Sequence, residues 1–119
     1  IDMKYLKMNI NDLEKKNDSN LIWRTAYNSA LSDYQKLFKK FDYYIFIKFP
    51  NWEFVIDWKY KQELDLRSIK SNIRLKKKLQ QFIKYYQKLS NWMSLTTPSY
   101  CNVLITLDRN QSIKKITYK

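Results

Sequence analysis

The chain has 119 residues with no glycine, no histidine and one cysteine, and its formal net charge is +12. Without histidine it has no imidazole base, no Ser-His or Cys-His pair and no histidine-bound metal, and without glycine it has no Walker loop and no dinucleotide-binding fingerprint. Cys101 alone cannot form an internal disulfide or a thiolate zinc site, so we expect no catalytic residues, no metal or cofactor, and no small-molecule substrate.

The N-terminal part of the sequence predicts helices. Residues 1–20 are polar and weakly periodic, which indicates a loose arm or the start of a helix. Residues 18–20 are N-cap types and precede a predicted helix over 21–30. Ser32 or Asp33 is expected to cap a second helix with one amphipathic face, because apolar residues follow at i, i+3, i+4 and i+7. These residues are Tyr34, Leu37, Phe38 and Phe41.

The period of the pattern changes in the next segment. Residues 43–49 are β-branched and aromatic and predict a strand, and Pro50-Asn51 is a turn signal. From Trp52 to Tyr60 the large apolar residues fall on every second position, which is the period of a half-buried strand. We therefore predict a β-hairpin on which the preceding helices pack.

The last part of the sequence predicts a helix and a second hairpin. Apolar residues recur at helical spacing over residues 75–89. Residues 101–107 alternate as a strand, in which Cys101 is expected to be a small buried hydrophobe. A polar turn at 108–111 then leads into a returning strand over 112–118.

These elements predict an α+β fold in two small halves. The first half, residues 1–64, is expected to be α-α-β-β, and the second, residues 65–119, to be a basic linker, a helix and a β-hairpin. No apolar run reaches the roughly 18 residues that a membrane helix needs, so no membrane partner is expected.

The positive charge is concentrated in the second half. Residues 1–60 carry a net charge of +2 and residues 61–119 a net charge of +10, and no acidic residue lies between Asp65 and Asp108. A one-sided basic field is typical of a protein that binds a polyanion, because each neutralised phosphate releases condensed counterions. The other interpretation is a solvated lysine face that codon bias produces. The candidate phosphate contacts are Arg67, Lys70, Arg74, Lys76, Lys77 and Lys78.

Two further features bear on nucleic-acid binding. Tyr85, Tyr86 and Trp92 lie within or just after the basic stretch and could stack on bases, although core packing is the expected role of Tyr86, which falls on the predicted apolar helix face. The polar turn over residues 108–112 can place side chains against a backbone or a base edge.

The codon usage that the composition implies is strongly skewed. Phe, Tyr, Met, Ile, Asn and Lys together make 60 of the 119 residues, whereas Gly, Ala, Arg and Pro make 8. This skew indicates an AT-rich genome, and we expect a mitochondrial protein or one from another AT-rich organelle.

Several short motifs in collinear order resemble the family of small-subunit ribosomal protein eight, in an organellar form. The family's main rRNA-contacting loop has a Ser-Thr-Ser run and a glycine. Here the run is reduced to Thr106, and the glycine is absent because the chain has none. The segments that carry the resemblance are Ile22-Trp23-Arg24 with Asn28-Ser29-Ala30, Leu37 to Ile45, Trp58-Lys59-Tyr60, Ile69 with Arg74-Leu75-Lys76-Lys77, and Leu104 to Ile113.

The resemblance implies a non-catalytic protein that binds the central domain of small-subunit rRNA and contacts neighbouring ribosomal proteins. By this resemblance the loop contacts would be Thr106, Arg109, Asn110 and Ser112, and the phosphate contacts would include Arg24, Arg74, Lys76 and Lys77.

Two alternatives remain open at this stage. The final helix and the Cys101 hairpin are also similar to the C-terminal domains of TonB and TolA periplasmic transducers, which are protein-interaction modules. A lineage-specific structural subunit of a large organellar complex would explain the basic composition as well.

Overall fold

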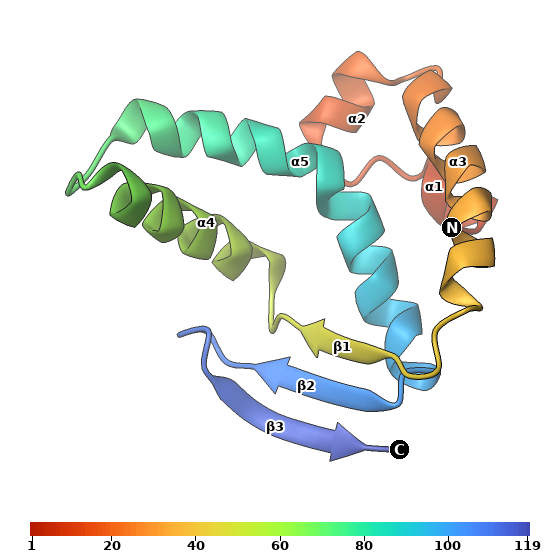
Figure 1. Ribbon diagram of the computed structural model, residues 1–119. Coiled ribbons are helices and arrows are strands. Elements are labelled where there is room, and N and C mark those ends of the chain that lie inside the picture. The colour runs from red at the N-terminus through yellow and green to blue at the C-terminus, as the bar shows by residue number, and fades with distance from the viewer. The chain divides into compact units, whose positions relative to one another are not determined.

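The computed structural model describes residues 1–119 and has the α+β fold class that the sequence predicts, with a C-terminal β-hairpin (Figure 1). The chain divides into two compact units, Ile1–Tyr44 and Ile45–Lys119. The elements in order are α1 (Met3–Lys7), α2 (Asp12–Asn17), α3 (Ile22–Phe38), β1 (Ile45–Lys48), α4 (Trp52–Arg67), α5 (Ile73–Thr96), a 3₁₀ turn (Thr97–Ser99), β2 (Val103–Leu107) and β3 (Ile113–Tyr118).

The elements of the N-terminal unit are all helices, and they include residues of the segment 1–20, expected as a loose arm or the start of a helix. The side chain of Asp2 accepts a hydrogen bond from the Tyr5 backbone N–H and caps α1, and Asn11 caps α2 in the same way through Glu14. Each cap satisfies a backbone donor that the first helical turn leaves unpaired. Residues 1–20 therefore form two short helices.

Helix α3 is one continuous helix of 17 residues. The prediction of a helix end near Ala30 and a new cap at Ser32 or Asp33 is wrong. The Ser32 hydroxyl donates instead to the Ser29 carbonyl within the same helix, at 2.7 Å, and so does not cap a following turn. The predicted apolar stripe of this helix remains largely exposed, at 43–54% for Tyr34, Leu37, Phe38 and Phe41.

Residues 52–67 form helix α4, and the predicted strand over 52–60 is wrong. Asn51 caps the helix by accepting from the Glu53 backbone N–H. The helix also carries polar residues at a spacing of four, namely Glu53, Asp57, Lys61 and Asp65, all of which are exposed. This spacing is that of a solvent-facing helical stripe, and it continues beyond the nine-residue window in which the apolar residues alternate.

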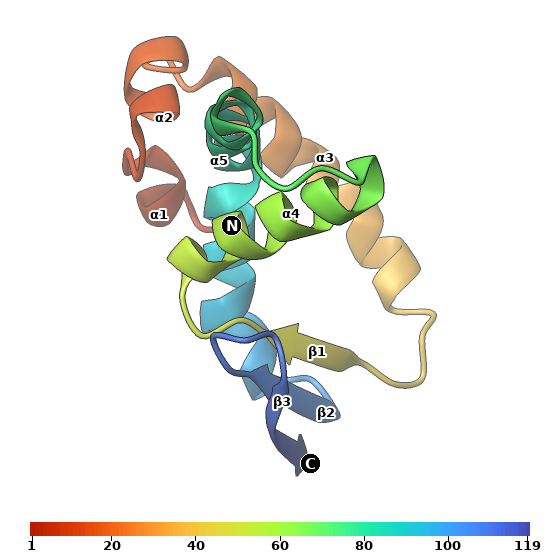
Figure 2. The same cartoon turned by 90° about the vertical axis from the view of Figure 1, so that its left-hand side faces the viewer.

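Helices α4 and α5 pair as a helical hairpin in the C-terminal unit. The Tyr60 hydroxyl accepts from the Asn72 backbone N–H at 2.8 Å, and Asn72 in turn caps α5 through the Leu75 N–H. Figure 1 shows α5 bending partway along its length, and Figure 2 shows it descending from the hairpin toward the sheet. The helix predicted over 75–89 is confirmed and is longer, at 24 residues.

The sheet has the strand order β1-β2-β3. Strand β1 pairs parallel to β2, and β2 pairs antiparallel to β3, as the predicted C-terminal hairpin requires. A parallel pair needs a long crossover, which the α4–α5 hairpin provides here. Because β1 belongs to this sheet, the division between the units lies at residues 44/45 and not at the predicted 64/65.

The buried apolar core is small for a chain of this length. Only Leu6, Leu75, Leu79, Ile83 and Cys101 are buried hydrophobic residues, and the burial of Cys101 at 2% exposure confirms its prediction. One sheet face carries two apolar rungs that remain partly or largely exposed, Ile45–Val103–Tyr118 and Ile47–Ile105–Ile116. No helix has the length and apolar character that crossing a membrane requires.

Replacing Ser68 by glycine is expected to raise the free energy of unfolding by about 1 kcal/mol. Ser68 follows α4 in the left-handed region, at φ 54°, where a Cβ costs roughly 1–2 kcal/mol and glycine is the usual residue. Urea unfolding measures the gain. Ser71→Gly is the control, because Ser71 lies in the same loop at negative φ and gains nothing. Equal effects of the two substitutions would contradict this explanation.

Candidate nucleic-acid interface

Arg24, predicted to contact phosphate, is completely buried and serves the N-terminal unit instead. Its Nε donates to Asp18 Oδ2 at 2.9 Å, and its Nη2 donates to the Asp18 carbonyl at 2.7 Å. Its Nη1 donates to the carbonyls of Leu6 and Met8, at 3.1 and 3.2 Å. The guanidinium therefore joins α1, the α2–α3 connection and α3, and the prediction that Arg24 binds RNA is wrong.

Asp18 is the carboxylate that holds this guanidinium in place. It also accepts from the backbone N–H groups of Trp23 and Arg24 in the first turn of α3. Burial raises the pKa of the Asp18 carboxyl, but the hydrogen bonds from Arg24 and from the Trp23 N–H outweigh it, and the pKa lies below its ordinary value of 3.8. Asp18 is therefore ionised at neutral pH and compensates the buried charge of Arg24.

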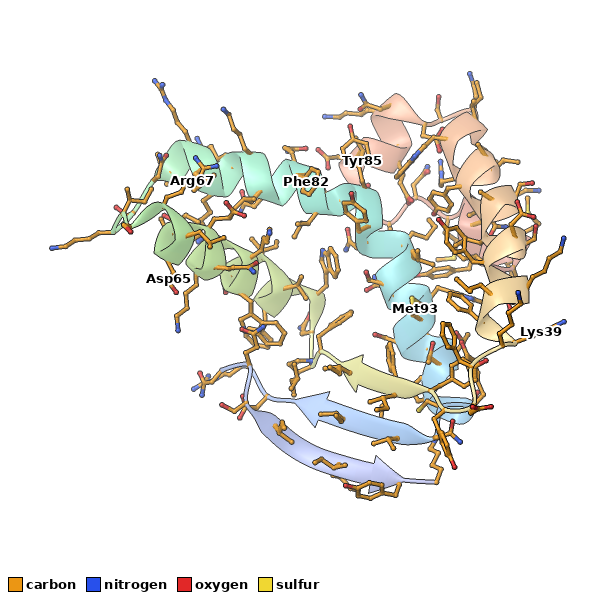
Figure 3. The ribbon with its side chains drawn as sticks, viewed as in Figure 1. Lys39, Asp65, Arg67, Phe82, Tyr85 and Met93 are labelled. Carbon is orange, nitrogen blue, oxygen red and sulfur yellow. The ribbon has the colours of Figure 1, made fainter.

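Helix α5 separates its exposed and covered residues into rows at a spacing of four (Figure 3). Over residues 73–88 two adjacent rows are exposed, and the other two rows are buried or half-buried. The exposed rows are Ile73, Lys77, Gln81 and Tyr85, and beside them Arg74, Lys78, Phe82 and Tyr86. We call these eight residues the exposed face of α5. It is cationic in the first two turns and aromatic in the next two.

The candidate phosphate contacts differ in whether a carboxylate already pairs with them. Lys70, Arg74, Lys77 and Lys78 are exposed and have no carboxylate partner. These four cations lie within nine residues, at the hairpin tip and on the first turns of α5. Together they present a compact group of positive charge to a polyanion.

Two other candidates are paired with carboxylates of α4. Arg67 Nε lies 3.5 Å from Glu63 Oε2, and hydrogen bonds from Lys59 and then from Arg67 hold the pKa of Glu63 below its ordinary value. Lys76 Nζ lies 3.9 Å from an Asp57 carboxylate oxygen and 5.5 Å from the ring centre of Tyr60. Exposed pairs of this kind are weak, so a phosphate can displace them.

The turn after β2 is ordered by its own aspartate. Asp108 Oδ1 accepts from the backbone N–H groups of Asn110 and Ser112, at 2.9 and 3.0 Å. The Arg109 carbonyl accepts from Trp58 Nε1 at 2.9 Å, which fixes the turn against α4. The side chains of Arg109, Asn110 and Ser112 are exposed, whereas Thr106 is half-buried and lines a groove with Lys48, Arg109 and Lys114.

The basic residues over 67–78 and the polar turn over 108–112 therefore belong to the same unit but do not lie in the same place. Trp58, against which the turn lies, is nine residues before Arg67 on α4, which corresponds to about 13 Å along a helix axis. A nucleic acid would need to extend along α4 to contact both regions.

The prediction that Tyr86 packs in the core is wrong. Tyr86 is 53% exposed, and Phe82, four residues before it, is 51% exposed. Their rings form an edge-to-face pair with centroids 5.4 Å apart. Phe82 and Tyr86 lie seven residues after the buried Leu75 and Leu79, so helical spacing alone places them beside the apolar face, and only the structure shows that they are exposed.

No protein family model matches this chain, and neither a curated protein nor a solved structure shows significant similarity to it.

Proposed function

We propose that this protein is a non-catalytic, rRNA-binding structural protein of a small ribosomal subunit, in a mitochondrion or another AT-rich organelle. The observation that carries the proposal is the group of unpaired cations Lys70, Arg74, Lys77 and Lys78, which lie together in a stretch without any acidic residue. Phosphate is the ligand that such a field attracts most strongly.

The distribution of apolar residues supports a place inside a larger assembly. The chain buries few hydrophobic side chains, and one face of its sheet is lined by apolar residues of all three strands. Exposed apolar patches of this kind mark contacts with other proteins. In the proposed particle the cations bind rRNA, and neighbouring ribosomal proteins cover the sheet face.

The resemblance to ribosomal protein eight supports the choice of rRNA over other polyanions. The loop residues Arg109, Asn110 and Ser112, which the resemblance selects, are exposed on an ordered turn. The Trp58-Lys59-Tyr60 motif lies in a helix, where the resemblance implies the end of a strand. The ribosomal assignment therefore depends on the charge distribution and on the loop.

Reversing two of the unpaired charges is expected to weaken RNA binding at least about tenfold. In Arg74→Glu with Lys77→Glu, two phosphate contacts are lost and two carboxylates repel the RNA backbone. Fluorescence anisotropy with a transcript of the central domain of a mitochondrial small-subunit rRNA measures the change.

The matched control is Lys39→Glu with Lys40→Glu. Both lysines are exposed in the N-terminal unit, and each double variant replaces two positive charges by two negative ones, so that the net charge falls from +12 to +8 in both. We expect the control to bind within about twofold of the unmodified protein. If both variants bind RNA as the unmodified protein does, the proposed function is wrong.

A further inference from the structure

The exposed face of α5 continues beyond its cations into aromatic residues without interruption. In one row Arg74 and Lys78 are followed by Phe82 and Tyr86, and in the adjacent row Lys77 is followed by Gln81 and Tyr85. Figure 3 shows Phe82 and Tyr85 on the part of α5 beyond the hairpin tip, near the bend of the helix. A ligand that binds the cations therefore meets these rings next.

The aromatic rings of this face are accessible although they are large and apolar. Phe82, Tyr85 and Tyr86 are 51%, 47% and 53% exposed, while Leu75, Leu79 and Ile83 of the same helix are buried. The helix thus already has an apolar side for packing. Phe82 and Tyr86 border that side but remain exposed, in the same row at a spacing of four as Arg74 and Lys78.

The spacing of the cations and the aromatic rings on the exposed face of α5 suits a polymer with alternating charged and planar parts. Phe82 lies four residues after Lys78 and Tyr86 four residues after Phe82, which places successive side chains about 6 Å apart along the helix axis. In single strands the bases are free to stack on aromatic rings while the backbone lies against cations. In a duplex the bases are stacked on one another, so a protein can contact only the phosphates and the base edges in the grooves.

We propose that the exposed face of α5 binds an unpaired RNA segment, with its phosphates on Arg74, Lys77 and Lys78 and its bases stacked on Phe82 and Tyr86. This inference rests on the proposed RNA-binding function and adds the class of RNA. A protein partner fits the face less well, because the half of the face nearest the hairpin tip would require a matching acidic surface, whereas RNA supplies charge and planar rings in one ligand.

The test compares two RNA probes with the full chain at one salt concentration. The first probe is a 12-nucleotide unstructured strand, and the second is a 12-base-pair duplex that contains the same strand. The unmodified protein is expected to bind the single strand more tightly. Phe82→Ala with Tyr86→Ala is expected to weaken single-strand binding about tenfold or more and duplex binding less than about twofold, since stacked bases contribute only to the first.

Three controls separate stacking from other causes. Tyr34→Ala with Phe38→Ala removes a comparable exposed aromatic pair, with ring centroids 6.3 Å apart on α3, and is expected to leave both affinities unchanged. Phe82→Leu with Tyr86→Leu keeps apolar volume without a π-face and is expected to behave as the alanine variant does. Phe82→Tyr with Tyr86→Phe keeps both rings and is expected to retain single-strand binding.

The outcomes distinguish this inference from the function on which it rests. If charge reversal at Arg74 and Lys77 weakens binding while the alanine pair at Phe82 and Tyr86 does not, RNA binding stands and stacking is wrong. Equal losses for strand and duplex also overturn the inference, as does a leucine variant that binds like the unmodified protein, because RNA binding would then not require a π-face. If neither probe binds and charge reversal has no effect, the proposed function itself is wrong.

Discussion

Replacing Arg24 by methionine is expected to lower the stability of the N-terminal unit by about 3–5 kcal/mol, because it leaves buried carboxylates without their counter-charge. Asp18 and Glu14 are 6% and 1% exposed, and both lie within ion-pair distance of the guanidinium. The carbonyls of Leu6 and Met8 also lose a donor. A loss of this size approaches the whole stability of a small domain, which is about 5–15 kcal/mol.

Amide hydrogen exchange in the full chain measures this loss element by element. The amides of α1–α3 should lose protection in Arg24→Met, while those of the β2–β3 hairpin should keep theirs, because the hairpin belongs to the other compact unit. Lys16→Met is the control, since Lys16 is exposed on α2 and its replacement should change stability by less than about 0.5 kcal/mol. A loss below about 1 kcal/mol for Arg24→Met would contradict the role assigned to this residue.

The pH dependence provides a second check on the same contact. The pKa of Asp18 is lower in the folded chain than its ordinary value of 3.8, so its contribution to stability is complete above that value. The contribution is lost as the pH falls through the folded pKa, where the carboxylate is protonated. The stability difference between the unmodified protein and Arg24→Met should therefore shrink below pH 3.8.

RNA affinity is expected to fall about a thousandfold when the salt concentration rises from 50 to 200 mM. The four unpaired cations, together with Arg67 and Lys76 once they leave their carboxylate partners, provide six phosphate contacts. Six contacts on a structured RNA correspond to a slope of about −5 in a plot of log affinity against log salt. Anisotropy titrations at four or more salt concentrations measure the slope.

The charge-reversal variant allows each contact to be counted. Arg74→Glu with Lys77→Glu removes two contacts, so its slope should be shallower by about 2, while the control at Lys39 and Lys40 keeps the original slope. An affinity that does not depend on salt would show that the positive charge is a solvated lysine face. Such a result would leave codon bias as the explanation of the lysine content.

Some elements were predictable because the information they require is local. The alternation in residues 101–107 and 112–118 predicts the C-terminal hairpin, and the strand over 43–49 is confirmed in its central residues, Ile45–Lys48. Helix α5 was predictable because its apolar residues repeat over more than four turns. In each case the pattern is long enough to distinguish the helical period of about 3.6 residues from the strand period of about 2 residues, or a turn signal marks its end.

Helix α4 was not predicted, although its sequence contains the necessary signals. Over nine residues, alternation of apolar side chains is compatible with a strand and also with a helix that is half-buried on several sides. The Asn51 cap and the polar spacing of four from Glu53 to Asp65 favour the helix. These signals become decisive only when the whole segment to Arg67 is considered.

The sequence by itself determined that this chain carries no histidine or glycine chemistry, that its charge is concentrated in one stretch, and where its last helix and hairpin lie. These properties depend on residue identities and on short-range periodicity. The tertiary structure alone decided that Arg24 is buried, that β1 pairs with β2, and that Phe82 and Tyr86 are exposed. Each of these depends on which distant segment covers a given side, because burial is a property of the packed chain and local sequence does not specify it.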